Sequence, residues 1–208
     1  MLDNPLRRLI LVRHGQQSDR VERDSPLSEL GRRQAGAVGE HLAGESIDAV
    51  FSSHLVRAHD TGLAIAAHHD LDCIVDERLR EIELGMHLPD GKRSADLLSE
   101  EELRAHGERF VATRKWDSFA FSESGDELRT RVGEALTAIG KAHPSGNIVV
   151  ACHGGVVNAV VGMVLGVTED FFCRSSHASV TRIRVGENHS VLEQLNEITH
   201  LTGDLHTW

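Results

Sequence analysis

Residues 9–15 read Leu-Ile-Leu-Val-Arg-His-Gly, and residues 148–155 read Ile-Val-Val-Ala-Cys-His-Gly-Gly. Each stretch is an apolar run of strand length that ends at a histidine followed by glycine. Open α/β sheets bind their ligands at the carboxyl ends of the strands. The two stretches therefore predict two buried strands that bring His14 and His153 to one rim of a sheet, with Arg13 beside the first histidine. Two imidazoles and a guanidinium at that rim suggest a site for covalent phosphate chemistry.

The rest of the chain alternates between strand and helix patterns. Apolar runs predict strands, and apolar stripes with helical spacing predict helices. In chain order we expect strands at 9–13, 47–52, 71–75 and 148–152, helices at 28–43, 54–69, 126–143 and 154–165, and a terminal hairpin at 179–185 and 190–195. This alternation predicts an α/β fold: a three-layer α/β/α sandwich whose central sheet is mostly parallel and has helices on both faces.

Residues 86–125 fit this alternation poorly. The segment is polar, carries charges of both signs, and has one expected helix at 99–110. Segments placed over a rigid scaffold often carry binding and specificity. We interpret this one as a cap, inserted into a single domain that spans residues 1–208 and lying over the rim of the sheet. The alternative is a solvated excursion that contacts no ligand.

Composition narrows the class of protein and its surroundings. The 208 residues carry a net charge of −10, and the sequence gathers no large basic face, which argues against a nucleic-acid or membrane partner. Three cysteines are too few for a disulfide framework and fit a reducing compartment. The N-terminus shows no signal-peptide pattern, and the apolar runs are too short to span a bilayer. We therefore expect a cytoplasmic protein, and leave a homodimer open.

Several segments, in this order along nearly the whole chain, resemble the histidine phosphatase superfamily of phosphoglycerate mutase-like enzymes. A single Arg-His-Gly triplet would be weak support, because short motifs recur by chance. The segments are the nucleophile motif at 11–15, a first-helix signature at 26–35, a second arginine (Arg57) within 52–61, an acid segment at 79–85, the second histidine within 151–155, and two further pieces at 177–181 and 196–201.

The resemblance implies phosphoryl transfer through a phosphohistidine. His14 would be the nucleophile, with its second ring nitrogen held by a carbonyl near Gly15, and His153 would donate to the phosphoryl oxygens. The sequence has neither a G-x-x-x-x-G-K-[ST] loop nor a carboxylate cluster with metal spacing. We therefore expect no metal and no cofactor, and assign charge neutralisation to Arg13 and Arg57, whose guanidinium groups match phosphate oxygens in pairs.

The resemblance also assigns a proton donor and substrate contacts. The family's acid stands four residues before a glycine, here Gly85, which selects Glu81 over Glu83. Gly154 and Gly155 open a helix whose free N–H groups favour an anion. The substrate-binding residues would be Arg13, Arg57, His153, Gly154, Gln17 and Arg20.

The sequence departs from the family's pattern in two places. After His14 the usual Trp-Asn pair is absent, and Arg20 stands where the asparagine is usual. After Gly85 the usual Trp-Glu-Gly is replaced by residues 86–91. The second departure weakens any inference about the substrate that is drawn from the acid segment.

The sequence thus predicts a metal-independent phosphomonoesterase that acts on a small phosphorylated metabolite. The alternatives are a phosphoglycerate mutase-type transfer and a phospho-ligand binding module without catalysis. With no tyrosine and only Trp116 and Trp208, we expect little aromatic surface for stacking a substrate. His41 and most other histidines show no partner pattern, Cys152 fits a small core residue, and a supporting role for His177 and His200 is left open.

Overall fold

The computed structural model describes residues 7–19, 24–186 and 189–208. Its core is a six-stranded sheet in the order β3-β2-β4-β1-β5-β6. The first four strands run parallel, and β5 is antiparallel to both β1 and β6. The strands are β1 (Arg7–Arg13), β2 (Ala49–Ser52), β3 (Cys73–Val75), β4 (Gly146–Cys152), β5 (Val180–Val185) and β6 (Ser190–Glu197).

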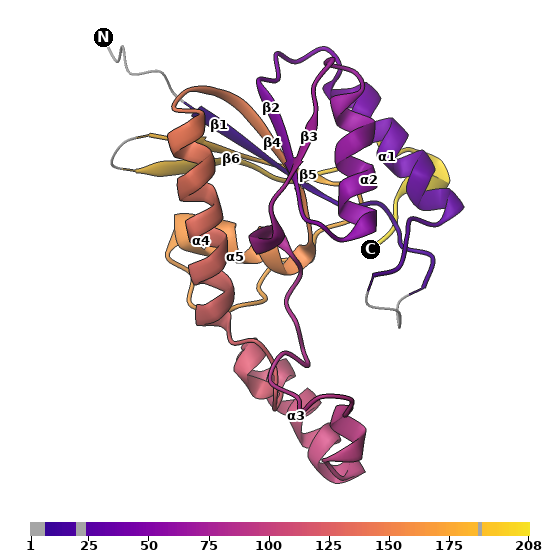
Figure 1. Ribbon diagram of the computed structural model, residues 1–208, viewed down its shortest axis with the longest axis vertical. Coiled ribbons are helices and arrows are strands. Elements are labelled where there is room, and N and C mark those ends of the chain that lie inside the picture. The colour runs from indigo at the N-terminus through magenta and orange to yellow at the C-terminus, as the bar shows by residue number, and fades with distance from the viewer. Residues whose placement is uncertain (1–6, 20–23, 187–188) are drawn as a thin grey trace.

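Helices cover both faces of this sheet, which confirms the predicted three-layer α/β/α sandwich. Figure 1 shows α1 (Glu29–Leu42) and α2 (Val56–Ala66) on one side, and α4 (Gly125–Ala142) and α5 (Gly154–Leu165) on the other. The apolar run of β1 contributes side chains to the hydrophobic core on both faces of the sheet, because successive strand side chains point to opposite faces. Leu9 and Leu11 pack with α4 and α5, whereas Ile10 and Val12 pack with α1 and α2.

Local hydrogen bonds determine where helices α1 and α2 begin and end. Ser28 caps α1, because its side chain accepts from Gly31 N at 3.0 Å. Helix α2 is shorter than the predicted 54–69. Leu55 is extended at its start, and His68 and His69 form tighter turns at its end, with N–H bonds three residues back. No helix of the described residues has the length and apolar character needed to cross a membrane.

The segment at 86–125 forms a projection. Its helix α3 (Glu100–Thr113) has no fully buried residue and extends away from the sheet beyond the end of α4 (Figure 1). The chain returns through a short turn of helix at Trp116–Ser118, and Trp116 stacks on Phe110 with the ring centroids 4.8 Å apart. Trp116 also meets Phe171 edge-on, so this end of the segment packs against the body of the molecule. Its role as a cap stays a prediction.

The parallel register of β1 and β4 positions the candidate site. Arg13 lies opposite Cys152, and His14 N donates to Cys152 O at 2.9 Å. The histidines that follow the two strands therefore leave the sheet side by side. The loop after β1 then passes so close to α1 that a Cβ on Gly15 would overlap the carbonyl oxygen of Gly31. Only glycine permits this approach.

Candidate active site

His14 and His153 lie together at the carboxyl ends of β1 and β4. Their ring centroids are 5.0 Å apart, and the residues are 3% and 0% exposed. Arg13 and Arg57 approach the same two rings from β1 and from the first turn of α2. The structure thus brings together the four residues at which the sequence predicted the phosphate would bind.

The His14 ring is held in one orientation. Its Nδ1 lies 2.7 Å from Gly15 O, and because a carbonyl only accepts, Nδ1 carries the proton. This leaves the lone pair on Nε2, which accepts from Arg57 Nε at 3.3 Å. Burial, together with the positive surroundings of His153, Arg13 and Arg57, holds the pKa of His14 well below its ordinary value. His14 is therefore a neutral imidazole with its lone pair directed into the site.

The His153 ring is fully buried. Among the described residues, neither of its ring nitrogens has a hydrogen bond. Burial, followed by the charges of Arg57 and Arg13, lowers its pKa well below the ordinary value. A buried polar group without a hydrogen bond costs stability, so such groups call for an explanation. A phosphoryl oxygen would supply the missing partner, and its negative charge would favour the protonated ring.

The loop before β5 orients Arg13, whereas Arg57 is set by its place in the first turn of α2. Arg13 donates to Ser175 O and to Nε2 of His177, the latter at 3.2 Å. The side chain of Arg57 is buried, and its carbonyl accepts from the Thr61 hydroxyl at 2.8 Å. His177 therefore supports Arg13, the role that the sequence left open for it.

Glu81 lies at the N-terminus of α5. Its Oε1 accepts from Gly155 N at 3.0 Å and from Ile82 N at 2.9 Å. The positive end of a helix favours a carboxylate at this position. The Gly155 N–H that the sequence offered to phosphate is thus bound by Glu81 in this structure. Glu83 lies elsewhere, with its carboxylate 3.9 Å from Arg80 Nε.

The sequence did not predict a buried ion pair that lies behind Glu81. Arg131 of α4 pairs with Glu123, with Nη2 2.8 Å from Oε2. It also donates to the carbonyls of Arg78, Arg80 and Glu81 at 2.7, 2.8 and 3.1 Å. Charged residues beside the apolar stripe of a helix are usually solvated, so nothing in the local pattern distinguished Arg131.

Arg13, Glu81 and the N-terminus of α5 line a cavity of about 330 Å³. It contains the predicted Gln17 and Gly154, whereas Arg20 lies outside the described residues. The expectation of little aromatic surface is wrong, because both tryptophans and Phe171 line the cavity after segments far apart in sequence converge. The cavity is lined by Arg13, Gln16, Gln17, Glu81, Trp116, Gly154, Gly155, Phe171, Arg174, Ser175, His177 and Trp208.

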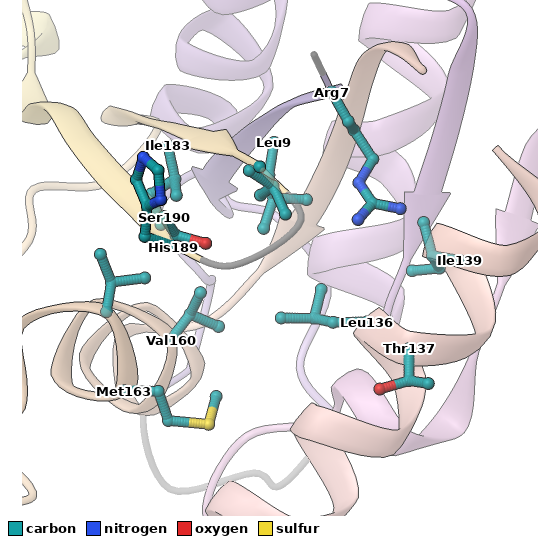
Figure 2. Close-up of a pocket in the computed structure, with 13 residues that line it drawn as sticks. Arg7, Leu9, Leu136, Thr137, Ile139, Val160, Met163, Ile183, His189 and Ser190 are labelled. Carbon is teal, nitrogen blue, oxygen red and sulfur yellow. The ribbon is translucent and has the colours of Figure 1, made fainter. Parts of the chain in front are cut away.

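A larger cavity, of about 600 Å³, lies between α4, α5 and the sheet. Figure 2 shows the apolar side chains of Leu136, Val160 and Met163 facing it, with Arg7 at one side. It contains none of the predicted catalytic residues. The smaller cavity is therefore the candidate active site, because Arg13, Glu81 and the N-terminus of α5 line it.

The chain is similar in sequence and fold to known phosphatases and phosphoglycerate mutase-like enzymes. The sequence matches the histidine phosphatase superfamily (branch 1) over residues 9–198. Phosphoserine phosphatase 1 of Hydrogenobacter thermophilus is 31% identical over 93% of this chain and 94% of its own length, and a probable phosphoglycerate mutase of Salmonella choleraesuis is 31% identical over 92% and 93%. The solved structure of a mycobacterial glucosyl-3-phosphoglycerate phosphatase has a TM-score of 0.76 and 27% identity, covering 92% of this chain and 99% of the other. The chain belongs to the histidine phosphatase superfamily, among its phosphatases and phosphoglycerate mutase-like enzymes.

Proposed function

We propose that this chain is a metal-independent phosphomonoesterase that forms a phosphohistidine on His14. One observation carries the proposal: a buried, neutral His14 has its lone pair on Nε2, and its ring lies 5.0 Å from the ring of His153, whose nitrogens have no hydrogen bond in the described part of the chain. Two guanidinium groups lie beside them. Such a site offers a nucleophile and three donors for phosphoryl oxygens. Preorganised donors of this kind stabilise the charge that develops during phosphoryl transfer.

The first step transfers the phosphoryl group to the protein. His14 Nε2 attacks phosphorus while the bond from phosphorus to the alcohol oxygen breaks. Glu81, which carries a proton in the complex with substrate, gives that proton to the alcohol oxygen. Arg57 Nε, which donates to His14 Nε2 in this structure, moves its hydrogen bond to a phosphoryl oxygen. Arg13 and His153 hold the other oxygens. Nδ1 keeps its proton and donates it in a hydrogen bond to Gly15 O, which keeps the ring in place throughout.

The second step returns the phosphoryl group to water. Glu81 takes a proton from the water that attacks phosphorus, the bond to His14 Nε2 breaks, and inorganic phosphate leaves. A mutase would return the phosphoryl group to a second hydroxyl of the substrate instead. A binding module would do neither. We favour hydrolysis, and keep the mutase as the second candidate because a mutase relative is as similar in sequence as a phosphatase.

The cavity wall supports a substrate class. Arg174 lies over the Trp208 ring, 5.5 Å from its centroid, on the wall of the cavity. It adds a cation separate from those that contact His14. We assign it to an anionic group on the alcohol part of the substrate, as in phosphoserine, the substrate named for one relative. The substrate would then be a small phosphomonoester that also carries a carboxylate.

The test is to trap the intermediate. Purified protein is mixed with ³²P-labelled p-nitrophenyl phosphate in excess EDTA and quenched in alkali, in which a phosphohistidine is stable. We expect label on the wild type and none on His14→Ala, and tighter inhibition by vanadate than by phosphate, because vanadate adopts the geometry of the transfer. Turnover that is abolished by EDTA and restored by zinc or magnesium would instead indicate a metallohydrolase. Label without phosphate release would favour a mutase.

Two wider expectations remain part of the proposal. The cysteine content and the charge favour a cytoplasmic protein without a nucleic-acid partner. A homodimer is the simplest oligomer to test, by light scattering of the purified chain.

A further inference from the structure

A second cluster of ligating side chains lies outside the candidate active site. It consists of His41 in the last turn of α1, Glu197 at the end of β6, and His200 in the turn that follows. One ligand atom from each residue lies within 4.8 Å of the other two. These residues come from two ends of the chain, so the fold and not the local sequence brings them together. The expectation that His41 lacks a partner is therefore wrong.

His200 is prepared as a ligand. Its Nε2 donates to Ala178 O at 2.9 Å, which leaves the lone pair on Nδ1. That nitrogen is buried, has no hydrogen bond among the described residues, and lies 3.8 Å from Glu197 Oε1. Its side chain is 5% exposed. Metal-binding histidines in proteins commonly donate their second nitrogen to a backbone carbonyl in this way.

Glu197 and His41 supply the other two donors. The Glu197 side chain is 4% exposed, and its orientation is fixed by Thr199, whose N–H and hydroxyl both donate to Oε1. His41 Nε2 lies 2.9 Å from Glu197 Oε2. The His41 side chain is 27% exposed, so the cluster has a route to solvent. The guanidinium of Arg182, 3.6 Å from Glu197 Oε2, is held by Glu45.

We propose that His41, Glu197 and His200 bind a first-row transition metal, with Zn²⁺ as the probe ion. Two imidazoles and a carboxylate form a donor set that zinc accepts, with water in the fourth position. The two rings are stacked in the empty cluster, 4.6 Å apart and inclined by 19°. A metal lies in the plane of each ring that binds it, so His41 must turn, and its Nε2 proton moves to Nδ1 or to solvent.

The site would support the active site from behind. Ala178, whose carbonyl accepts from His200, donates its own N–H to His14 O at 3.2 Å. Ala178 also has a positive φ of 54°, a conformation that costs free energy and needs support. A metal that fixes His200 would therefore hold the backbone behind His14. The effect is on rigidity and stability, because no atom of the cluster takes part in the proposed reaction.

The experiment measures zinc binding by folded protein without a histidine tag. Metal-free wild type, His41→Gln and His68→Gln are titrated with Zn²⁺ by calorimetry, and with Co²⁺ while its visible d–d bands are recorded. His68, exposed beyond the end of α2, is the matched control for a surface histidine. We expect one ion per chain and a rise in Tm with zinc. His41→Gln should lose at least about tenfold in affinity, as loss of even an outer partner does, and His68→Gln should bind normally.

The proposal fails if the wild type binds no zinc stoichiometrically, or if His41→Gln binds as tightly as the wild type. Glu197→Gln provides a second variant, which should also lose binding. Circular dichroism of each variant shows whether the fold is kept. The readout is metal binding, so its failure leaves the phosphohistidine proposal untouched, and loss of turnover in His14→Ala leaves this one untouched.

Discussion

The floor of the candidate active site and its wall are built differently. On the floor, His14, His153 and Arg57 are almost fully buried, and they come from two adjacent strands and the start of a helix. On the wall, Arg174 is exposed and Trp208 is 44% exposed, and both belong to irregular segments. The floor is rigid because the sheet determines it, whereas the wall depends on loops that return from distant parts of the chain.

This difference separates chemistry from selectivity. Fixed groups in a dry environment stabilise developing charge without reorganising, so the floor should set the rate of phosphoryl transfer for any substrate. Exposed groups on the wall interact in water and contribute less each, so they should select among substrates. A substitution on the floor should therefore lower the turnover of all substrates, whereas a substitution on the wall should change the preference among substrates.

The largest effect is expected on the floor. His14→Ala removes the proposed nucleophile, and turnover of every phosphomonoester should fall by about 10⁴-fold or more. Steady-state kinetics with p-nitrophenyl phosphate measures this loss. Circular dichroism should show an intact fold, and His68→Ala, which changes an exposed histidine, should keep its turnover. Even a few per cent of wild-type turnover in His14→Ala would contradict the covalent mechanism.

The next largest effect is expected at Glu81, the proposed proton donor. Glu81→Gln removes the proton that an alkoxide leaving group needs, and turnover of an alkyl phosphate should drop by about 10²- to 10⁴-fold. Hydrolysis of p-nitrophenyl phosphate, whose leaving group is a weak base, should fall much less. A plot of log kcat against leaving-group pKa should therefore be steeper for the variant.

Two further variants sharpen this assignment. Glu83→Gln, two residues away, should give the wild-type dependence on the leaving group, and the reverse pattern would move the acid to Glu83. Gly155→Ala alters the site without changing the carboxyl group. Its Cβ would overlap Glu81 Oε1, so the carboxylate must move. We expect the same leaving-group pattern as in Glu81→Gln, in a milder form.

A smaller and more selective effect is expected on the wall. Arg174→Met should lower kcat/KM for phosphoserine by about tenfold, because it removes one exposed charge–charge contact. Phosphoethanolamine differs from phosphoserine in lacking the carboxylate, so its kcat/KM should change little. Equal losses for both substrates would show that Arg174 acts on the floor, or that the substrate has no second anionic group.

The two regions also differ in how well the sequence predicts them. The floor could be located from the apolar runs before His14 and His153, because parallel strands bring residues at their carboxyl ends to a single rim. The wall could not. Trp208 reaches the cavity because the preceding residues fold back, with Thr207 O accepting from His177 N at 3.0 Å. No local periodicity encodes such a return.

The supports behind the site were equally hidden. Arg131 and Glu123 are charged residues whose burial follows only from tertiary packing. His41 and His200 look like ordinary surface histidines until α1 and β6 place them together. Patterns in the sequence report on strands and helices, and pairs that form between distant elements need the coordinates.

The last prediction concerns the free energy of unfolding, which depends on pH because the two histidines of the floor are buried. His14 and His153 have pKa values lowered by burial, so in a window below about 6.5 the unfolded chain binds protons that the folded chain does not. The free energy of unfolding should therefore fall as the pH decreases through that window. His153→Ala removes one such group, and the slope of the free energy against pH between 5 and 6 should decrease by about 1.4 kcal/mol per pH unit, the value for one proton. Urea denaturation at several pH values measures the slope, and at pH 8 the slopes of wild type and variant should agree, since His153 is neutral there in both states. Equal slopes in the acidic window would mean that His153 is protonated in the folded chain, and the floor would then be a cationic site before the substrate arrives.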